Sequence, residues 1–301
     1  MSTTPQTSDA TRAARPAVLA GARRRPRLRP STIGQYTLLG VLVFLSFFLV
    51  VLMIALSLRP SVLIYADFWG LPWPPVFTNY QTALLDLLPA MWRTLWMTVL
   101  SIAGILAVSC LAAYAFARMR FPGQGAFFLA VLAVLMIPGA ILLTPQFLLA
   151  DQLGLRGSLW GLIVFYIAGG LPFGIFLIVT FFRSQPEEIF EAARIDGASE
   201  MQSLLRIAVP LAMPILVTVA IFNFIGIYGD FIWPTLMLNQ DQQTLLMALA
   251  AYSPQLNQFA SRPDIGAQTA GYAFATLPQL VIFAFGMKYF IQGVTSGAVK
   301  G

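Results

Sequence analysis

The sequence predicts an all-α protein that spans a membrane six times. Of its 301 residues, 58% are hydrophobic and only 10% are charged, whereas soluble domains carry about 25% charged residues. Mean hydropathy is +0.78. Six uncharged stretches are long enough to cross a bilayer, which requires about 20 mostly apolar residues. Each stretch is expected to be a helix, because an open strand would leave its backbone groups unpaired in lipid.

The predicted spans follow one another along the chain and are separated by segments of different lengths. In order they are Ile33–Leu58, Thr94–Ala117, Phe121–Ala150, Gly157–Phe182, Ile207–Gly229 and Ile265–Met287. The third contains Pro138 and Pro145, so its outer part is expected to be kinked or loop-like. A seventh span at Leu245–Tyr252 is the competing interpretation. Because that stretch has only eight residues, we expect an external or interfacial helix there.

The basic residues orient these spans. Residues 1–32 hold seven arginines and are expected to form a flexible basic tail in the cytoplasm. The membrane domain then covers residues 33–292, and a short tail, 293–301, returns to the cytoplasm. Of the 18 basic residues, only four would lie outside: Arg59, Arg93, Arg156 and Arg262. This asymmetry is the positive-inside pattern of a multi-pass membrane protein. The first apolar run is too long for a cleaved signal peptide.

Several functions are disfavoured by what the sequence lacks. It has no histidine and one cysteine, Cys110, so neither catalytic residues nor metal ligands are expected. The spans are nearly free of ionisable residues, which ion-coupled carriers use inside the bilayer. The phosphate-binding pattern G-x-x-x-x-G-K-[ST] does not occur. If the chain transports a solute uphill, the energy must come from another polypeptide at the cytoplasmic face.

A charged segment between the fourth and fifth spans, residues 184–209, is predicted to be a two-helix loop. Pro186 and the two acids after it are typical of a helix start. Gly197 allows a turn with positive φ, and Ser199 to Gln202 match a capping box that begins a second helix. That helix is expected to end at Val209.

Two interpretations of this loop stay open from its residues alone. It could be a solvated hairpin in which Glu191 and Arg194 pair at i, i+3. It could instead be a contact surface, which the apolar residues Ile189, Phe190 and Ile195 favour.

The same segment resembles a known motif. EAA at 191–193, Gly197 after three intervening residues, and Ile207-x-Val209-Pro210 after nine more are similar to the Glu-Ala-Ala motif of membrane subunits of ATP-binding-cassette importers. FTNY (77–80), AYAFARMRFPG (113–123), LPFGIFLIVTFF (171–182) and GVTSGAVKG (293–301) resemble the smaller, six-span permease of the maltose-type sugar branch. The resemblance extends over about residues 35–301. Val209 departs from the leucine usual at that position.

The resemblance implies the role of each matching residue. The loop would be the coupling helix pair that docks on an ATPase subunit. The implied contacts are Glu191, Ala192, Ala193, Asp196, Gly197, Ala198 and Pro210. Glu191 would offer a carboxylate, the alanines would permit close approach, and Asp196 would help fix the turn at Gly197. The C-terminal tail would also reach the ATPase through Gly297, Val299 and Lys300, although fraying is the ordinary behaviour of a chain end.

The substrate pathway is only weakly marked. Many sugar permeases carry Trp-Asn-Asp at the end of span five, whereas this chain reads Tyr228-Gly229-Asp230. Asn223 lies within the same apolar run, where a buried amide needs partners. It either lines the pathway or links helices. Asn223, Tyr228 and Asp230 are the pathway candidates.

These observations favour a permease subunit in the inner membrane of a prokaryote, forming half of a sugar pathway. The resemblance implies four kinds of partner: two ATPase subunits that bind ATP and Mg²⁺, a second permease, an extracytoplasmic solute-binding protein, and the lipid bilayer. The chain itself would bind no cofactor and no nucleic acid. The alternatives are an importer of a phosphate ester, peptide or amino acid, a secondary carrier, and a scaffold without a transport role.

Overall fold

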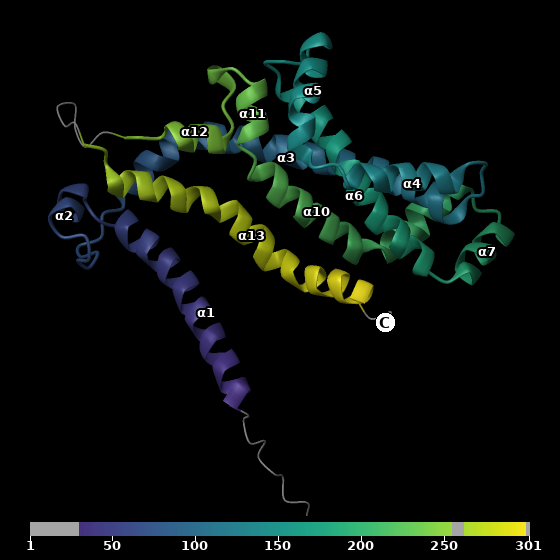
Figure 1. The fold of residues 1–301 in the computed structure, drawn as a ribbon, viewed down its shortest axis with the longest axis horizontal. Helices are drawn as coiled ribbons and strands as arrows, with labels where there is room; N and C mark the ends of the chain where they lie inside the picture. The colour runs from purple at the N-terminus through teal and green to yellow at the C-terminus, as the bar shows by residue number, and fades with distance from the viewer. Residues whose placement is uncertain (1–29, 255–261, 299–301) are drawn as a thin grey trace, which may run out of the picture. The chain divides into compact units, whose positions relative to one another are not determined.

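The computed structural model describes residues 30–254 and 262–298, which form helices joined by turns and short irregular segments (Figure 1). The chain divides into two compact units, residues 1–49 and 50–301, and every site discussed below lies in the second. The elements are α1 (Pro30–Ser57), α2 (Ser61–Ala66), α3 (Thr78–Arg118), α4 (Gln124–Leu135), α5 (Gly139–Gln152), α6 (Leu159–Ser184), α7 (Glu187–Ile195), α8 (Glu200–Ser203), the π-helix η1 (Leu204–Ala208), α9 (Val209–Leu211), α10 (Met213–Tyr228), α11 (Ile232–Met237), the 3₁₀ turn η2 (Gln240–Gln242), α12 (Leu245–Ala251) and α13 (Ile265–Ala298).

The predicted all-α membrane fold is confirmed. Among the described residues, α1, α3, α6 and α13 are long and apolar enough to cross a membrane. The number rises to six if each of two bent pairs, α4–α5 and α8–α10, counts as one span. These elements occur in the same order as the six predicted stretches. α12 has seven residues, too few for a seventh crossing. The number of crossings and the side of each terminus stay predictions.

The third predicted span is broken, as its prolines indicated. α4 and α5 differ in direction by 102°. Pro138 stands directly before α5 with φ −58° and ψ 124°, and a proline also disfavours helical geometry in the residue before it. Pro145 lies inside α5 without ending it. The break therefore belongs to Pro138 rather than to Pro145.

Helix α3 is longer than the apolar run that predicted it. It begins at Thr78, not at Thr94, and reaches Arg118. The predicted span began after Arg93, because a charged residue limits a stretch suited to lipid. A charged residue does not, however, end a helix. The Nε atom of Arg93 donates to the main-chain oxygen of Gln243 at 3.1 Å. The charged side chain is therefore accommodated without breaking the helix.

Helices α3 and α6 pack side by side along a seam of glycines. A Cβ atom at Gly104 would lie 2.4 Å from Ile167, and one at Gly174 would lie 2.5 Å from the Oγ atom of Ser109. A side chain at either position would overlap its neighbour, so this approach requires glycine. Close backbone approach is a main source of helix association in lipid, where the hydrophobic effect between helices is weak.

Helix α13 extends the membrane domain at its C-terminal end. It runs to Ala298 and so through most of the segment, residues 293–301, that was predicted as a tail. Gly297 lies within this helix, whereas Val299 and Lys300 lie outside the described residues. The predicted contacts of these residues with an ATPase stay predictions.

Candidate functional site

The segment between α6 and α10, residues 184–211 (the hairpin), has a defined structure. Glu187 and Glu188 occupy the first turn of α7 after Pro186, where their negative charges interact favourably with the helix dipole. Phe190 is 1% exposed, and its ring centroid lies 6.4 Å from that of Tyr114 in α3. Full burial of a phenylalanine side chain contributes about 2–3 kcal/mol. This side chain therefore anchors α7 to the membrane domain.

The turn after α7 is closed by main-chain hydrogen bonds. Gly197 has φ +79°, a conformation that suits glycine. Its N–H donates to Arg194, and the N–H of Ala198 donates to Ala193 at 2.9 Å. This pair of bonds is the Schellman arrangement that ends helices. The prediction of a glycine turn is confirmed. Asp196, expected to help fix it, is exposed and its carboxylate makes no contact within the described part of the chain.

The second helix begins at the predicted capping box. The hydroxyl of Ser199 accepts from the N–H of Gln202 at 3.3 Å, and the Gln202 side chain accepts from the N–H of Ser199 at 2.9 Å. Two otherwise unpaired donors at the helix start are satisfied in this way. The hairpin is therefore held at its tip by both the end of α7 and the start of α8.

The prediction that this helix ends at Val209 was wrong. The chain continues through η1 and α9 to Leu211, and a bend of 77° follows. In η1 the N–H of Val209 donates to Leu204, five residues back. This wider π-type turn adapts the helix to Pro210, which has no N–H and crowds the preceding turn. Pro210 therefore lies inside the helical segment and not beyond it.

Most of the predicted contact residues are exposed on the hairpin. Glu191, Ala192, Gly197 and Pro210 are exposed, and Ala193 and Ala198 are partly buried. Ile195 is 86% exposed. The hairpin therefore turns Phe190 inward and presents the Glu-Ala-Ala residues outward.

Arg118, at the end of α3, joins the base of the hairpin to the membrane domain. Its side chain is 4% exposed and forms an ion pair with Glu187. It also donates to the main-chain oxygens of Phe182 at 2.6 Å and Gln185 at 2.8 Å. The guanidinium group lies 4.1 Å from the ring centroid of Phe190. A buried cation with this many partners fixes the junction between α6 and α7 against α3.

A second connection links α3 to the other helix of the hairpin. The Tyr114 hydroxyl donates to Glu200 at 2.6 Å, and this bond lowers the pKa of Glu200. Arg194 contacts Glu200 at 3.2 Å and Glu187 at 3.5 Å. The local pair of Arg194 with Glu191 is therefore not formed, because both acids that Arg194 contacts lie elsewhere on the hairpin.

Sequence reasoning missed the roles of Tyr114 and Arg118. Both lie in the stretch AYAFARMRFPG, whose residues indicated only a resemblance to the six-span sugar permease. Their spacing of four residues places them on one face of α3, and that face meets the hairpin. The spacing was visible in the sequence, but the partner surface became apparent only in the fold.

A polar cavity of about 340 Å³ lies among α5, α6 and α10. Its polar lining includes Gln146, Tyr166, Asn223 and Asp230. Tyr166 donates to Asp230 at 2.9 Å. The other oxygen of this carboxylate accepts hydrogen bonds from the N–H groups of Ile232, at 3.0 Å, and of Trp233, at 3.3 Å. Asp230 therefore also caps the start of α11.

Of the three pathway candidates, two share this cavity. Asn223 donates to the main-chain oxygen of Val219 on its own helix at 2.9 Å, and its carbonyl oxygen would lie 2.8 Å from a Cβ atom at Gly170 of α6. Tyr228 lies elsewhere: it is 3% exposed, and its hydroxyl donates to Ala275 of α13 at 2.7 Å. Tyr228 therefore links α10 to α13.

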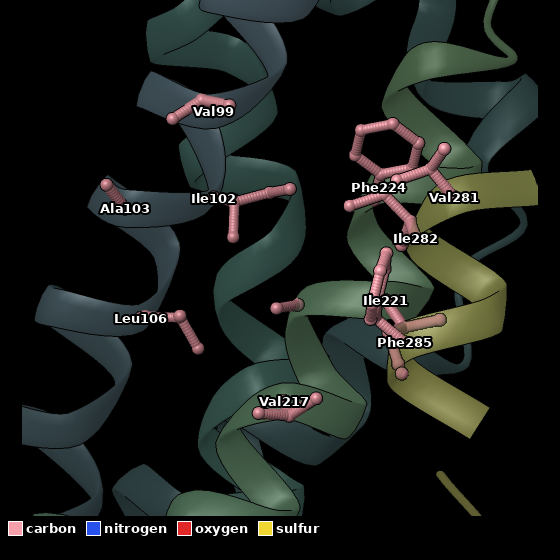
Figure 2. Close-up of a pocket in the computed structure, with 12 residues that line it drawn as sticks. Val99, Ile102, Ala103, Leu106, Val217, Ile221, Phe224, Val281, Ile282 and Phe285 are labelled. Atoms are coloured by element: carbon pink, nitrogen blue, oxygen red, sulfur yellow. The ribbon is translucent and has the colours of Figure 1, made fainter. Parts of the chain in front are cut away.

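A larger cavity, of about 530 Å³, opens among α3, α10 and α13 (Figure 2). The side chains drawn there are aliphatic or phenylalanine, with Ile102 on one wall and Phe224 and Phe285 opposite. Sugar hydroxyls in such a space would lose their hydrogen bonds to water without replacement. The smaller polar cavity is therefore the better candidate for a carbohydrate.

An all-α membrane domain with an exposed two-helix hairpin between α6 and α10 fits the membrane subunit of a transport system. Residues 17–296 match the family described as binding-protein-dependent transport system inner membrane component. This match covers nearly the whole chain, and the chain belongs to that family.

Curated relatives and a solved structure agree with this assignment. The chain is 31% identical to the diacetylchitobiose uptake system permease protein NgcG of Streptomyces coelicolor, over 74% of each chain. It is 33% identical to the trehalose transport system permease protein SugB of Mycobacterium tuberculosis, over 82% of this chain and 90% of that protein. A bacterial ABC transporter that imports the acidic polysaccharide alginate has the same fold, with a TM-score of 0.75 at 22% identity, covering 88% of this chain and 100% of the other.

Proposed function

We propose that this chain is the membrane-spanning permease subunit of an ATP-binding-cassette importer, and that it forms half of the pathway for a sugar. Its partners would be two ATPase subunits carrying ATP and Mg²⁺, a second permease and an extracytoplasmic solute-binding protein. Relatives named for diacetylchitobiose, trehalose and, in Bacillus subtilis, maltodextrin support a carbohydrate substrate.

The observation that carries the coupling role is the construction of the hairpin. Its tip is closed by the turn at Gly197 and the capping box, so it is suited to transmit force as a unit. Its base is held to α3 through Arg118 and Tyr114. Closure of the ATPase subunits would move the tip, and these contacts would pass the movement to α3. Alternating access would follow as a rigid-body change, with ATP favouring one state and the sugar the other.

The first test is affinity purification of the tagged full chain from its native membrane, followed by mass spectrometry. We expect an ATPase with a phosphate-binding loop and a second permease to copurify. Reconstitution of that assembly with candidate binding proteins then allows labelled sugars to be compared with amino acids, peptides and phosphate esters. Uptake restricted to a non-sugar solute would overturn the carbohydrate assignment while leaving the importer role intact.

The docking surface has its own test. Glu191→Ala should weaken retention of the ATPase through detergent purification, because it removes the exposed carboxylate of the Glu-Ala-Ala segment. Glu188→Ala is the matched control, since it removes an exposed acid from the same helix outside that segment. Equal retention of the ATPase by the wild-type chain and Glu191→Ala would count against direct contact at this residue.

Asn223 is the residue that we expect to contact the sugar, because it lines the polar cavity. We expect Asn223→Leu to raise the KM for sugar uptake by about tenfold, the cost of roughly one polar contact to a substrate hydroxyl. Tyr228→Phe is the control, because its hydroxyl is bonded to α13 away from the cavity. An unchanged KM in Asn223→Leu would remove this residue from the pathway.

A further inference from the structure

A separate charged cavity lies where the end of α3, the start of α4 and the junction of α6 with α7 meet. It has a volume of about 290 Å³. Its charged residues are Arg118, Arg120, Arg183 and Glu187. We call this cavity the arginine pocket. Three guanidinium groups face one carboxylate there, so the pocket carries an excess of positive charge.

That excess is concentrated on two of the arginines. Glu187 is already paired with Arg118 and lies 3.5 Å from Arg194. Arg183 donates once, to the main-chain oxygen of Phe116 at 3.2 Å. Arg120 is exposed and makes no hydrogen bond or ion pair within the described part of the chain. Arg120 and Arg183 therefore have no carboxylate partner there.

The surroundings of the pocket suit an anion with an apolar tail. Helix α4 begins at Gln124 with no acidic residue in its first turn and no side-chain cap, so its N-terminal donors favour negative charge. Phe128 packs between Phe116, at 5.5 Å, and the guanidinium of Arg183, at 5.1 Å. Phe127, on the same helix, is 62% exposed. Charge and exposed apolar surface thus adjoin at one end of the membrane helices.

We propose that the arginine pocket binds the headgroup phosphate of an anionic phospholipid, whose acyl chains lie along the exposed apolar residues of α4. Arginine forks match phosphate oxygens well, and basic pockets between membrane helices are suited to anionic headgroups. A free phosphate would use the same arginines but would gain nothing from the apolar flank. The inference requires only that the chain lies in a bilayer, not that it transports a sugar.

The test uses native mass spectrometry of the purified full chain titrated with phosphatidylglycerol or phosphatidylcholine. Arg120→Gln and the double variant Arg120→Gln/Arg183→Gln remove the charges that have no carboxylate partner. Arg156→Gln is the matched control, because that arginine also lies over an aromatic ring, at 4.7 Å, but pairs with Asp151 in another part of the fold. Arg120→Gln breaks no hydrogen bond or ion pair among the described residues, so a loss of lipid binding in a variant that is expressed and purified normally is not expected to be a folding defect.

We expect the wild-type chain to retain phosphatidylglycerol in preference to phosphatidylcholine. The double variant should bind it at least about tenfold more weakly, since it loses more than one charge-assisted hydrogen bond, and Arg156→Gln should bind it normally. Equal binding by all variants, equal loss in Arg156→Gln, or no preference between the lipids would overturn the proposal. Displacement of the lipid by inorganic phosphate, but not by chloride at equal ionic strength, would identify a free anion instead and would also overturn it.

Discussion

At the scale of single residues, the shape of the hairpin depends on backbone conformation as much as on side chains. Gly197 holds φ +79° so that two N–H groups can close the end of α7. The sequence predicted this turn because glycine before a capping box has few other roles. It did not predict that the turn would be closed by main-chain hydrogen bonds without one from the Asp196 carboxylate, because residue identity does not specify main-chain pairing.

We expect Gly197→Pro to abolish uptake while membrane insertion remains normal. Proline fixes φ near −65° and cannot donate to Arg194, so at this turn it costs more than about 1 kcal/mol. Uptake assays and quantification of the chain in membrane fractions would measure the two effects separately. Gly154→Pro is the control, because Gly154 also has positive φ, at +67°, and donates to Asp151, but lies far along the chain from the hairpin. Normal uptake by a normally inserted Gly197→Pro variant would remove the hairpin from coupling.

At the scale of elements, apolar runs located the membrane helices well and their ends poorly. The prediction began α3 at Thr94 because Arg93 is charged, yet the helix starts at Thr78. It ended the second hairpin helix at Val209 because Pro210 follows, yet a π-type turn carries the helix past it. The two errors have different causes: hydropathy reports where lipid can be and not where α3 begins, and Pro210 was expected to end a helix that a π-type turn carries past it.

Loss of a contact between α3 and the hairpin is expected to uncouple ATP hydrolysis from sugar uptake. Tyr114→Phe removes only the hydroxyl that donates to Glu200, and a hydrogen bond to a charged group contributes about 1.5–3 kcal/mol. We expect sugar uptake by the assembled transporter to fall by about tenfold, with ATP hydrolysis largely retained. Paired measurements of uptake and phosphate release would show this split.

Tyr65→Phe serves as the control for Tyr114→Phe, because the Tyr65 hydroxyl donates to the main-chain oxygen of Pro263 at 2.9 Å, away from the hairpin. If uptake and hydrolysis fell together in Tyr114→Phe, the tyrosine would support docking or assembly rather than the transfer of movement.

At the scale of the whole molecule, composition and charge placement sufficed to predict an all-α membrane protein, and the Glu-Ala-Ala segment sufficed to predict its family. The pathway was less accessible. Asn223 and Asp230 come together with Tyr166 in one cavity, while Tyr228 bonds to α13. Residues five apart on one helix face different neighbours, and only the packing of α5, α6 and α13 around α10 decides which of them meet.

The isolated chain is expected to be inactive as a pump. Reconstituted alone in liposomes, it should accumulate no sugar under an imposed proton or sodium gradient, because its spans offer few ionisable groups for ion coupling. Adding the ATPase, the second permease, the binding protein and ATP should restore uptake. Gradient-driven accumulation by the chain alone would instead identify a secondary carrier.

The length of α3 has a mechanical consequence. Its 41 residues extend about 60 Å at 1.5 Å per residue, roughly twice the hydrocarbon thickness of a bilayer. One end carries Tyr114 and Arg118, and far along the helix Arg93 and Thr94 hold the segment that contains α12. A helix of that length acts as a lever: a tilt of about 10° displaces one end by about 10 Å relative to the other. A tilt that moves the hairpin end of α3 would therefore move its other end by a comparable distance in the opposite direction.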